Sequence, residues 1–335
     1  MPATVPPIVA TQALDRAPRR PLQPFLRLVR LSDAMCTSDE CSSTDRRSFL
    51  ARGLAAGAAM LAGVRAQAAR RRIESREVSF PTMVGAVRGY LAVPKGRSSP
   101  GVVLTHGEFG LPQTHRETAD ELASSGFAAL AIERFSRIQG MTWQDLQADD
   151  RGAGLYRAET FAREEIEEGR AALDWLGHLD RVDAARLGIV GFCGGGIRAI
   201  RLAALDPRVQ AVAAFYPPPR IPAQYKNVGD PSPDLLELST LPTCRLQIHF
   251  GAEDYIVKAP DMELLATRAR EAGAHVEVYE YTAAGHAFYD RTDASAYRPQ
   301  AAATARGRYL NFLRESLARA RVTIPPTSAA SRITR

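Results

Sequence analysis

The segment Gly191-Phe192-Cys193-Gly194-Gly195 constrains the fold of this chain more than any other segment. A short apolar run, Arg186–Val190, precedes it, and an alanine-rich run that favours a helix, Ile197–Ala204, follows it. Glycines on both sides of a central side chain permit a sharp turn from a strand into a helix and leave that side chain exposed at the turn. This G-x-C-x-G pattern therefore predicts a layered α/β fold in which Cys193 is a nucleophile.

Alternating strand and helix patterns continue along most of the 335 residues. An opening β-hairpin is predicted at Glu74–Phe80 and Ala86–Val93, where polar and apolar residues alternate. Further strands are predicted at Gly101–Thr105, Phe127–Ile132, Arg186–Val190, Val209–Phe215, Cys244–Phe250 and His275–Tyr281, and helices at Thr114–Ser125, Ala158–Leu179, Ala259–Ala272 and Ala301–Ala320. This order predicts an α/β fold with a mostly parallel central sheet and helices on both of its faces.

The first 68 residues have the features of an export signal. Thr44–Leu50 contains two adjacent arginines and resembles the twin-arginine motif, and small residues suited to cleavage stand at 66–68. The apolar run between them, Phe49–Val64, is 16 residues long, shorter than the roughly 20 that a membrane span needs. Met35 is an alternative start that would give a more ordinary leader.

We therefore expect three parts: an N-terminal extension with a twin-arginine signal peptide at 1–68, the α/β domain at 69–321, and a disordered C-terminal tail at 322–335. The twin-arginine machinery would be a partner, the location would be periplasmic or secreted, and the mature protein would be a monomer without a stable membrane span.

The charge balance argues against nucleic acid as a partner. The net charge is +6, but residues 1–68 hold nine of the basic and only five of the acidic residues, which accounts for +4 of it. The remaining chain is thus nearly neutral. Of the four cysteines, cleavage would leave Cys193 and Cys244. They are predicted at opposite ends of their strands, too far apart for a disulfide, so both are expected to be free thiols.

Two further residues complete a catalytic pattern with Cys193. Asp254 follows the strand that ends at Phe250, and His286 follows the strand that ends near Tyr281. The order nucleophile, acid, histidine is that of α/β-hydrolases. An imidazole can move the thiol proton, and a carboxylate orients the imidazole and stabilises its cation.

Each of these residues also has a structural alternative. Asp254 could cap the following helix, Glu253 is a nearby competing acid, and His286 could be an ordinary loop histidine. His249 lies within a strand and is expected to be structural, and no histidines or cysteines show the spacing of a metal site.

The motifs around Cys193, Asp254 and His286 resemble those of the dienelactone hydrolase family from about Val78 to Leu317. A fourth element supports this resemblance: His106-Gly107-Glu108-Phe109-Gly110 directly follows a predicted strand. The resemblance implies that Glu108 holds or deprotonates the thiol. A surface carboxylate is the alternative. The backbone N–H groups of Phe109 and Gly194 would form the oxyanion hole.

The substrate-binding positions depart from the family pattern. Family members that open dienelactones carry an arginine four residues beyond the histidine, which binds the substrate carboxylate. This chain has Asp290 at that position, with Arg291 beside it, while Arg134 and Arg137 follow the strand Phe127–Ile132. These three arginines are candidate substrate-binding residues, and a solvated basic edge is the alternative for Arg134 and Arg137.

We therefore expect a hydrolase that cleaves a small-molecule ester or lactone through a cysteinyl acyl-enzyme, without a cofactor or metal. A general carboxylesterase or thioesterase of the same fold is one alternative. A redox-sensing thiol protein on this scaffold is the other, although such a sensor would need neither Asp254 nor His286. A turn buried under Glu108 would keep the Cys193 thiol protonated until substrate arrives, so we expect alkylation by iodoacetamide to be slow at neutral pH. Fast labelling would indicate a standing thiolate paired with His286.

Overall fold

A computed structural model of the chain describes residues 72–83, 85–96, 98–107, 110–137, 164–220, 235–237 and 240–318. The predicted export signal and its cleavage site, the tail at 322–335, and the loop residues Glu108 and Phe109 lie outside these ranges. The bounds 1–68, 69–321 and 322–335 therefore stay predictions.

One eight-stranded sheet carries the fold, in the order β1-β2-β4-β3-β5-β6-β7-β8. Its strands are β1 (Ile73–Thr82), β2 (Gly85–Pro94), β3 (Ser99–Thr105), β4 (Ala128–Glu133), β5 (Val182–Phe192), β6 (Val209–Phe215), β7 (Arg245–Gly251) and β8 (His275–Tyr281). The β1–β2 and β2–β4 pairs are antiparallel, and every other pair is parallel. All strands from β3 onward therefore end at one edge of the sheet, where the carboxyl ends of parallel strands form sites.

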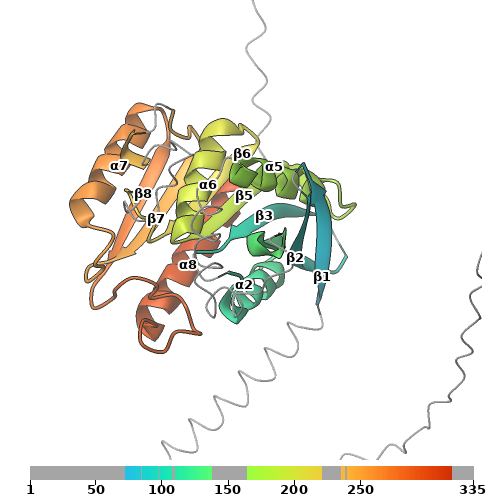
Figure 1. Cartoon of the computed structure of the whole chain (residues 1–335), viewed down its shortest axis with the longest axis horizontal. Coiled ribbons are helices and arrows are strands. Elements are labelled where there is room, and N and C mark those ends of the chain that lie inside the picture. The colour runs from blue at the N-terminus through green and yellow to red at the C-terminus, as the bar shows by residue number, and fades with distance from the viewer. Residues whose placement is uncertain are drawn as a thin grey trace, which may run out of the picture. The chain divides into compact units, whose positions relative to one another are not determined.

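Helices lie on both sides of the sheet (Figure 1). They are α2 (Gln113–Ser124), α5 (Glu164–Gly177), α6 (Gly194–Leu205), α7 (Ala259–Glu271) and α8 (Pro299–Ser316), with short 3-10 turns η1 (Arg134–Arg137) and η3 (Leu235–Glu237). Because helices cover both faces, the central strands are apolar along their whole length, as in Val102–Leu104 and Ala211–Phe215, which are fully buried. The predicted α/β class with its opening hairpin is confirmed.

Element boundaries differ from the sequence expectation at a few places. β5 begins at Val182 rather than at Arg186, because Val182 and Asp183 already pair with Ser99 and Pro100, ahead of a bulge in β5 at residues 184–186. The exposed residues in this part of β5 hide it from an apolar pattern. α8 begins at Pro299, two residues earlier than expected, since proline suits the first turn of a helix. Among the described helices, none is both long and apolar enough to cross a membrane.

Candidate active site

The turn between β5 and α6 places Cys193 at the carboxyl edge of the sheet. Cys193 has a φ of 52° and a ψ of −124°, a positive-φ conformation whose strain costs a non-glycine residue roughly 1–3 kcal/mol. Hydrogen bonds hold it there, since the Cys193 amide donates to Phe215 O (2.9 Å) and Cys193 O accepts from the Gly196 amide (2.8 Å). Only glycine fits at position 195, because a Cβ there would overlap the backbone of Thr105. The sequence therefore enforces the sharp turn that presents the thiol.

A line of contacts joins the thiol to a buried carboxylate. His286 Nε2 lies 3.2 Å from Cys193 Sγ, and His286 Nδ1 lies 2.8 Å from Asp254 Oδ2. Asp254 is fully buried, and its second oxygen accepts the amides of Ile256 (2.8 Å) and Val257 (2.9 Å). The structure thus brings together three residues that the sequence placed after three different strands, and it selects Asp254 over the exposed Glu253.

The loops that carry the acid and the histidine are joined to each other. The amides of Ala252 and Glu253 donate to Tyr281 O and Ala284 O, both at 2.9 Å. Gly251 permits this approach, because a Cβ there would overlap the backbone of Ala284. The positions of Asp254 and His286 are therefore fixed relative to one another by backbone contacts as well as by their own hydrogen bond.

The surroundings of His286 favour its charged form. Burial opposes the charge, but the adjacent Cys193 sulfur and the hydrogen-bonded Asp254 carboxylate outweigh burial and raise the pKa of His286 to about 10. At neutral pH the imidazole is then a cation in contact with sulfur, a state that suits protonation of a leaving group.

Two tyrosines flank the His286 ring. Tyr216 is buried with its ring centroid 5.0 Å from that of His286, and Tyr255 is 76% exposed with its centroid at 6.0 Å. Burial, followed by nearby negative groups, raises the pKa of Tyr216 well above its ordinary value, so its phenol is neutral. Sequence reasoning did not identify either tyrosine as part of this region.

Polar contacts hold the described residues on either side of positions 108 and 109, between β3 and α2. His106 Nδ1 lies 2.7 Å from Gly107 O, and the Leu111 amide donates to Glu133 Oε2 (3.0 Å). Burial lowers the pKa of His106, which keeps the ring neutral. At the start of the loop between β3 and α2, a Cβ on Gly107 would lie 3.8 Å from the sulfur of Cys193.

Glu133 and Arg198 complete these contacts from β4 and α6. Burial of Glu133 opposes its charge, but its hydrogen bonds, which include those from the amides of Leu111 and Phe135, lower its pKa to about 2. Arg198 donates to His106 O. The sequence analysis did not identify these contacts of Glu133 and Arg198, although an acidic residue directly after the apolar run of β4 was a usable signal.

The amide of Gly194, a predicted oxyanion donor, lies at the first position of α6. An amide at that position has no carbonyl of its own helix to bond. Its predicted partner, the amide of Phe109, lies outside the described residues.

The candidate substrate-binding arginines have other contacts in the structure. Arg134 is 2% exposed, with its Nε 3.8 Å from Glu168 Oε2. Arg291 forms ion pairs with Glu117 (3.2 Å) and Glu121 (2.8 Å) of α2. The side chain of Arg137 is not among those described. A role for these residues in substrate binding stays a prediction.

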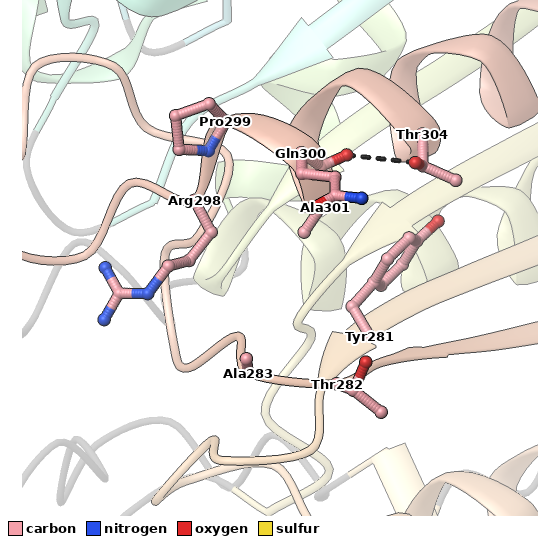
Figure 2. Close-up of a pocket in the computed structure, with 8 residues that line it drawn as sticks. All are labelled: Tyr281, Thr282, Ala283, Arg298, Pro299, Gln300, Ala301 and Thr304. Carbon is pink, nitrogen blue, oxygen red and sulfur yellow. Dashed lines mark hydrogen bonds between the residues drawn. The ribbon is translucent and has the colours of Figure 1, made fainter.

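A hollow of about 390 Å³ lies between the end of β8 and the start of α8 (Figure 2). It is lined by Tyr281, Thr282, Ala283, Arg298, Pro299, Gln300, Ala301 and Thr304. The catalytic candidates are absent from this lining, and most of its side chains are exposed. Within the described part of the chain, no three His, Cys, Asp or Glu side chains gather in a way that could hold a metal. Cys193 and Cys244 are both unpaired.

The mostly parallel sheet, with a cysteine, a histidine and an aspartate in contact at its carboxyl edge, defines an α/β-hydrolase. Comparison with known proteins makes the assignment more specific. The chain belongs to the dienelactone hydrolase family, whose characteristic pattern matches residues 87–317. It is accordingly a carboxylic ester hydrolase.

Individual relatives agree with this family. The carboxymethylenebutenolidase of Pseudomonas putida is 29% identical over 237 residues, which cover 70% of this chain and 91% of that protein. A Bradyrhizobium protein named as a probable 2-oxo-3-(5-oxofuran-2-ylidene)propanoate lactonase is 30% identical over 239 residues, 67% of this chain and 88% of that protein. Among solved structures, a dienelactone hydrolase-like promiscuous phosphotriesterase from metagenomic libraries shares the fold, with a TM-score of 0.58 and 24% identity over 73% of this chain and 99% of that one.

Proposed function

We propose that this enzyme cleaves a small-molecule ester or lactone through a cysteinyl acyl-enzyme, with Cys193 as nucleophile. The observation that carries the proposal is the continuous contact from Cys193 Sγ through His286 to the buried Asp254. A thiolate held beside an imidazolium is an active nucleophile at neutral pH, where a free thiol is mostly protonated.

The reaction then proceeds in two halves. The thiolate attacks the carbonyl carbon, and the amides of Gly194 and Phe109 hydrogen-bond the resulting oxyanion. The imidazolium of His286 gives its proton to the leaving alkoxide oxygen as the bond from carbon to that oxygen breaks. In the second half, His286 takes a proton from water, the hydroxide attacks the thioester, and the acid leaves as the thiolate and imidazolium are restored.

Asp254 keeps the Nδ1 proton of His286 in place through both halves. Glu108 is proposed as a second partner for the thiol, and the support for this role is its position in the loop that begins beside Cys193 at Gly107.

Replacement of each described cysteine tests the nucleophile. We expect Cys193→Ala to abolish turnover of 4-nitrophenyl acetate and Cys244→Ala to retain it. Cys244 directly precedes β7, at the end of the strand opposite to the carboxyl edge that holds Cys193, and burial raises the pKa of its thiol to about 12. Rapid quenching of the wild-type reaction followed by peptide mass spectrometry should locate one acyl group on Cys193. Turnover that survives Cys193→Ala at the wild-type rate would refute the proposal.

We further propose that the protein is exported by the twin-arginine pathway and acts outside the cytoplasm as a monomer. The support is the paired arginines at 46–47 and the apolar run that follows them. Fusion of residues 1–68 to a reporter that is active only after export tests the location, with both arginines replaced by lysine as the control. Export of the lysine variant at the original level would contradict the pathway, and a dimer in gel filtration would contradict the monomer.

A further inference from the structure

A fixed carboxylate lies four residues beyond His286. The amide of Asp290 donates to Ala287 O (2.9 Å), which closes the turn between the two positions. Asp290 Oδ1 accepts hydrogen bonds from the hydroxyl of Thr114 (2.7 Å) and from the amide (2.9 Å) and hydroxyl (2.6 Å) of Thr292. These contacts hold the carboxylate between the His286 loop and the first turn of α2.

Contacts on either side place this carboxylate near the nucleophile. His115, next to Thr114, packs edge-on against Phe192 with ring centroids 4.5 Å apart. Tyr289, next to Asp290, lies 5.5 Å from the same Phe192 ring. Phe192 directly precedes Cys193, so His115 and Tyr289, which flank the Thr114–Asp290 contact, both pack against the residue next to the nucleophile.

The neighbouring cations do not neutralise Asp290. Arg291 is held by two carboxylates of α2, and Arg116 by Glu77 at 3.0 Å. Burial lowers the pKa of His115 to about 3, so that ring is uncharged at neutral pH. Across the described ranges, no cationic side chain forms an ion pair with Asp290. Its negative charge is also felt next to the triad, where it contributes after burial to the raised pKa of Tyr216.

We propose that Asp290 determines the charge selectivity of the active site, disfavouring acyl groups that carry a carboxylate and favouring neutral or cationic ones. The proposal rests on the proposed function and specifies its substrate class. Four residues beyond the catalytic histidine, this chain holds a carboxylate in place through three hydrogen bonds.

The thiol itself can report the local charge without any turnover. Iodoacetate and iodoacetamide react with the same thiolate, so the fraction of thiolate cancels from the ratio of their rates. The rates at Cys193 are followed by peptide mass spectrometry in the full chain, for the wild type and for Asp290→Asn. The asparagine keeps an oxygen that can accept the bonds of Thr114 and Thr292.

Asp293→Asn is the matched control. Asp293 Oδ1 accepts the amide (3.0 Å) and hydroxyl (2.6 Å) of Ser295 in the same kind of turn, but Asp293 is exposed and has no contact with α2. Thermal melts establish that both variants are folded.

We expect Asp290→Asn to raise the iodoacetate-to-iodoacetamide ratio about three- to tenfold, the effect of one unit charge across a partly solvated site. Asp293→Asn should change the ratio by less than about 1.5-fold, and added salt should shrink the difference. A ratio that Asp290→Asn changes no more than Asp293→Asn does would overturn the proposal.

Matched esters extend the test to substrates. The 4-nitrophenyl esters of hexanoate, of mono-adipate and of 6-aminohexanoate have equal acyl length and differ in terminal charge. We expect the wild type to turn over the carboxylate ester slowest, and Asp290→Asn to narrow that gap. A wild type that prefers the carboxylate ester overturns the selectivity proposal, whereas absence of any Cys193-dependent turnover overturns only the proposed function, because the alkylation ratio is measured independently.

Discussion

Replacement of Asp254 by asparagine tests the proton-transfer half of the site. Ile256 and Val257 direct two amides at Asp254 Oδ1, so the oxygen of an asparagine should remain there and its NH₂ should face His286. Nδ1 must then accept a hydrogen bond, which moves the ring proton to Nε2, beside sulfur. The neutral ring would present the wrong tautomer to Cys193 and could no longer take its proton.

The size of the effect follows from the charge on His286. The rise of its pKa from 6.5 to about 10 corresponds to about 5 kcal/mol at 1.36 kcal/mol per unit. Cys193 and Asp254 both contribute to this stabilisation of the protonated His286. If Asp254 supplies about half, the variant lowers the pKa of His286 by about two units. Because the ring would also be held in the wrong tautomer, we expect kcat/KM at pH 7 to fall by about 10²–10⁴, the upper end being the loss seen when the aspartate of a serine-protease triad is replaced by asparagine.

The assay combines turnover with thiol reactivity. Values of kcat/KM for 4-nitrophenyl acetate are measured from pH 5 to 10, and iodoacetamide rates at Cys193 over the same range. In the wild type, the charged His286 should persist until the pH approaches 10. A thiolate paired with it would make alkylation fast at neutral pH, in place of the slow labelling expected from a thiol held protonated by Glu108. In Asp254→Asn, His286 should lose its proton at a lower pH, so the high-pH step of the alkylation profile should move to lower pH.

Glu253→Gln provides the control, because it neutralises the adjacent, exposed carboxylate and should leave both profiles unchanged. A folded Asp254→Asn variant that keeps more than about one fifth of the wild-type kcat/KM, or that leaves the high-pH step of the alkylation profile in place, would refute this reasoning. Slow wild-type alkylation would instead indicate a protonated thiol and would favour Glu108 as its partner.

Three further predictions concern the surrounding fold. Gly195→Ala should lower the free energy of unfolding by more than about 2 kcal/mol in urea titrations, because its Cβ would overlap the backbone of Thr105. Gly307→Ala has open space around its Cβ and should instead raise the free energy of unfolding by about 0.5–1 kcal/mol. Equal effects of the two substitutions would contradict the argument. Burial lowers the pKa of His249 to about 3, so between about pH 3 and 6.5 the unfolded chain binds more protons than the folded one. The free energy of unfolding should therefore fall as the pH drops through that window, by up to about 1.4 kcal/mol per pH unit. His249→Gln should lose less stability between pH 7 and 4.5 than the wild type, and an identical loss would refute this. Glu133→Gln should lower kcat about tenfold or more, as a weakened oxyanion contact would, with little change in KM or in alkylation of Cys193. A variant that changes only KM would show that the Glu133 contacts with Leu111 and Phe135 do not act on the transition state.

The local patterns of the sequence predicted the fold and the contacts between the catalytic candidates. Glycines around Cys193 specify the turn, and apolar runs specify the parallel strands. Because parallel strands end at one edge, Asp254 and His286 were expected near Cys193 although they lie 61 and 93 residues beyond it. This inference needs only strand order and strand ends, both of which are local properties.

Features that depend on partners from distant elements were not predictable in this way. Arg134 follows its strand as expected, yet it is buried against Glu168, a residue on α5. Arg291 is bound to two glutamates of α2 that lie about 170 positions earlier in the chain. A side-chain pair of this kind depends on how helices pack, which single-sequence periodicity does not encode.

The backbone contacts between the Asp254 and His286 loops have a consequence for how activity is lost. Because the amides of Ala252 and Glu253 bond to carbonyls at the end of β8 and in the loop after it, opening either loop breaks bonds that hold the other. The two loops should therefore exchange their amide hydrogens as one cooperative unit, with a single opening free energy. On heating, Asp254 and His286 would then leave the active site in one step. A partly opened enzyme, in which only one of the two loops has left its place, should not accumulate.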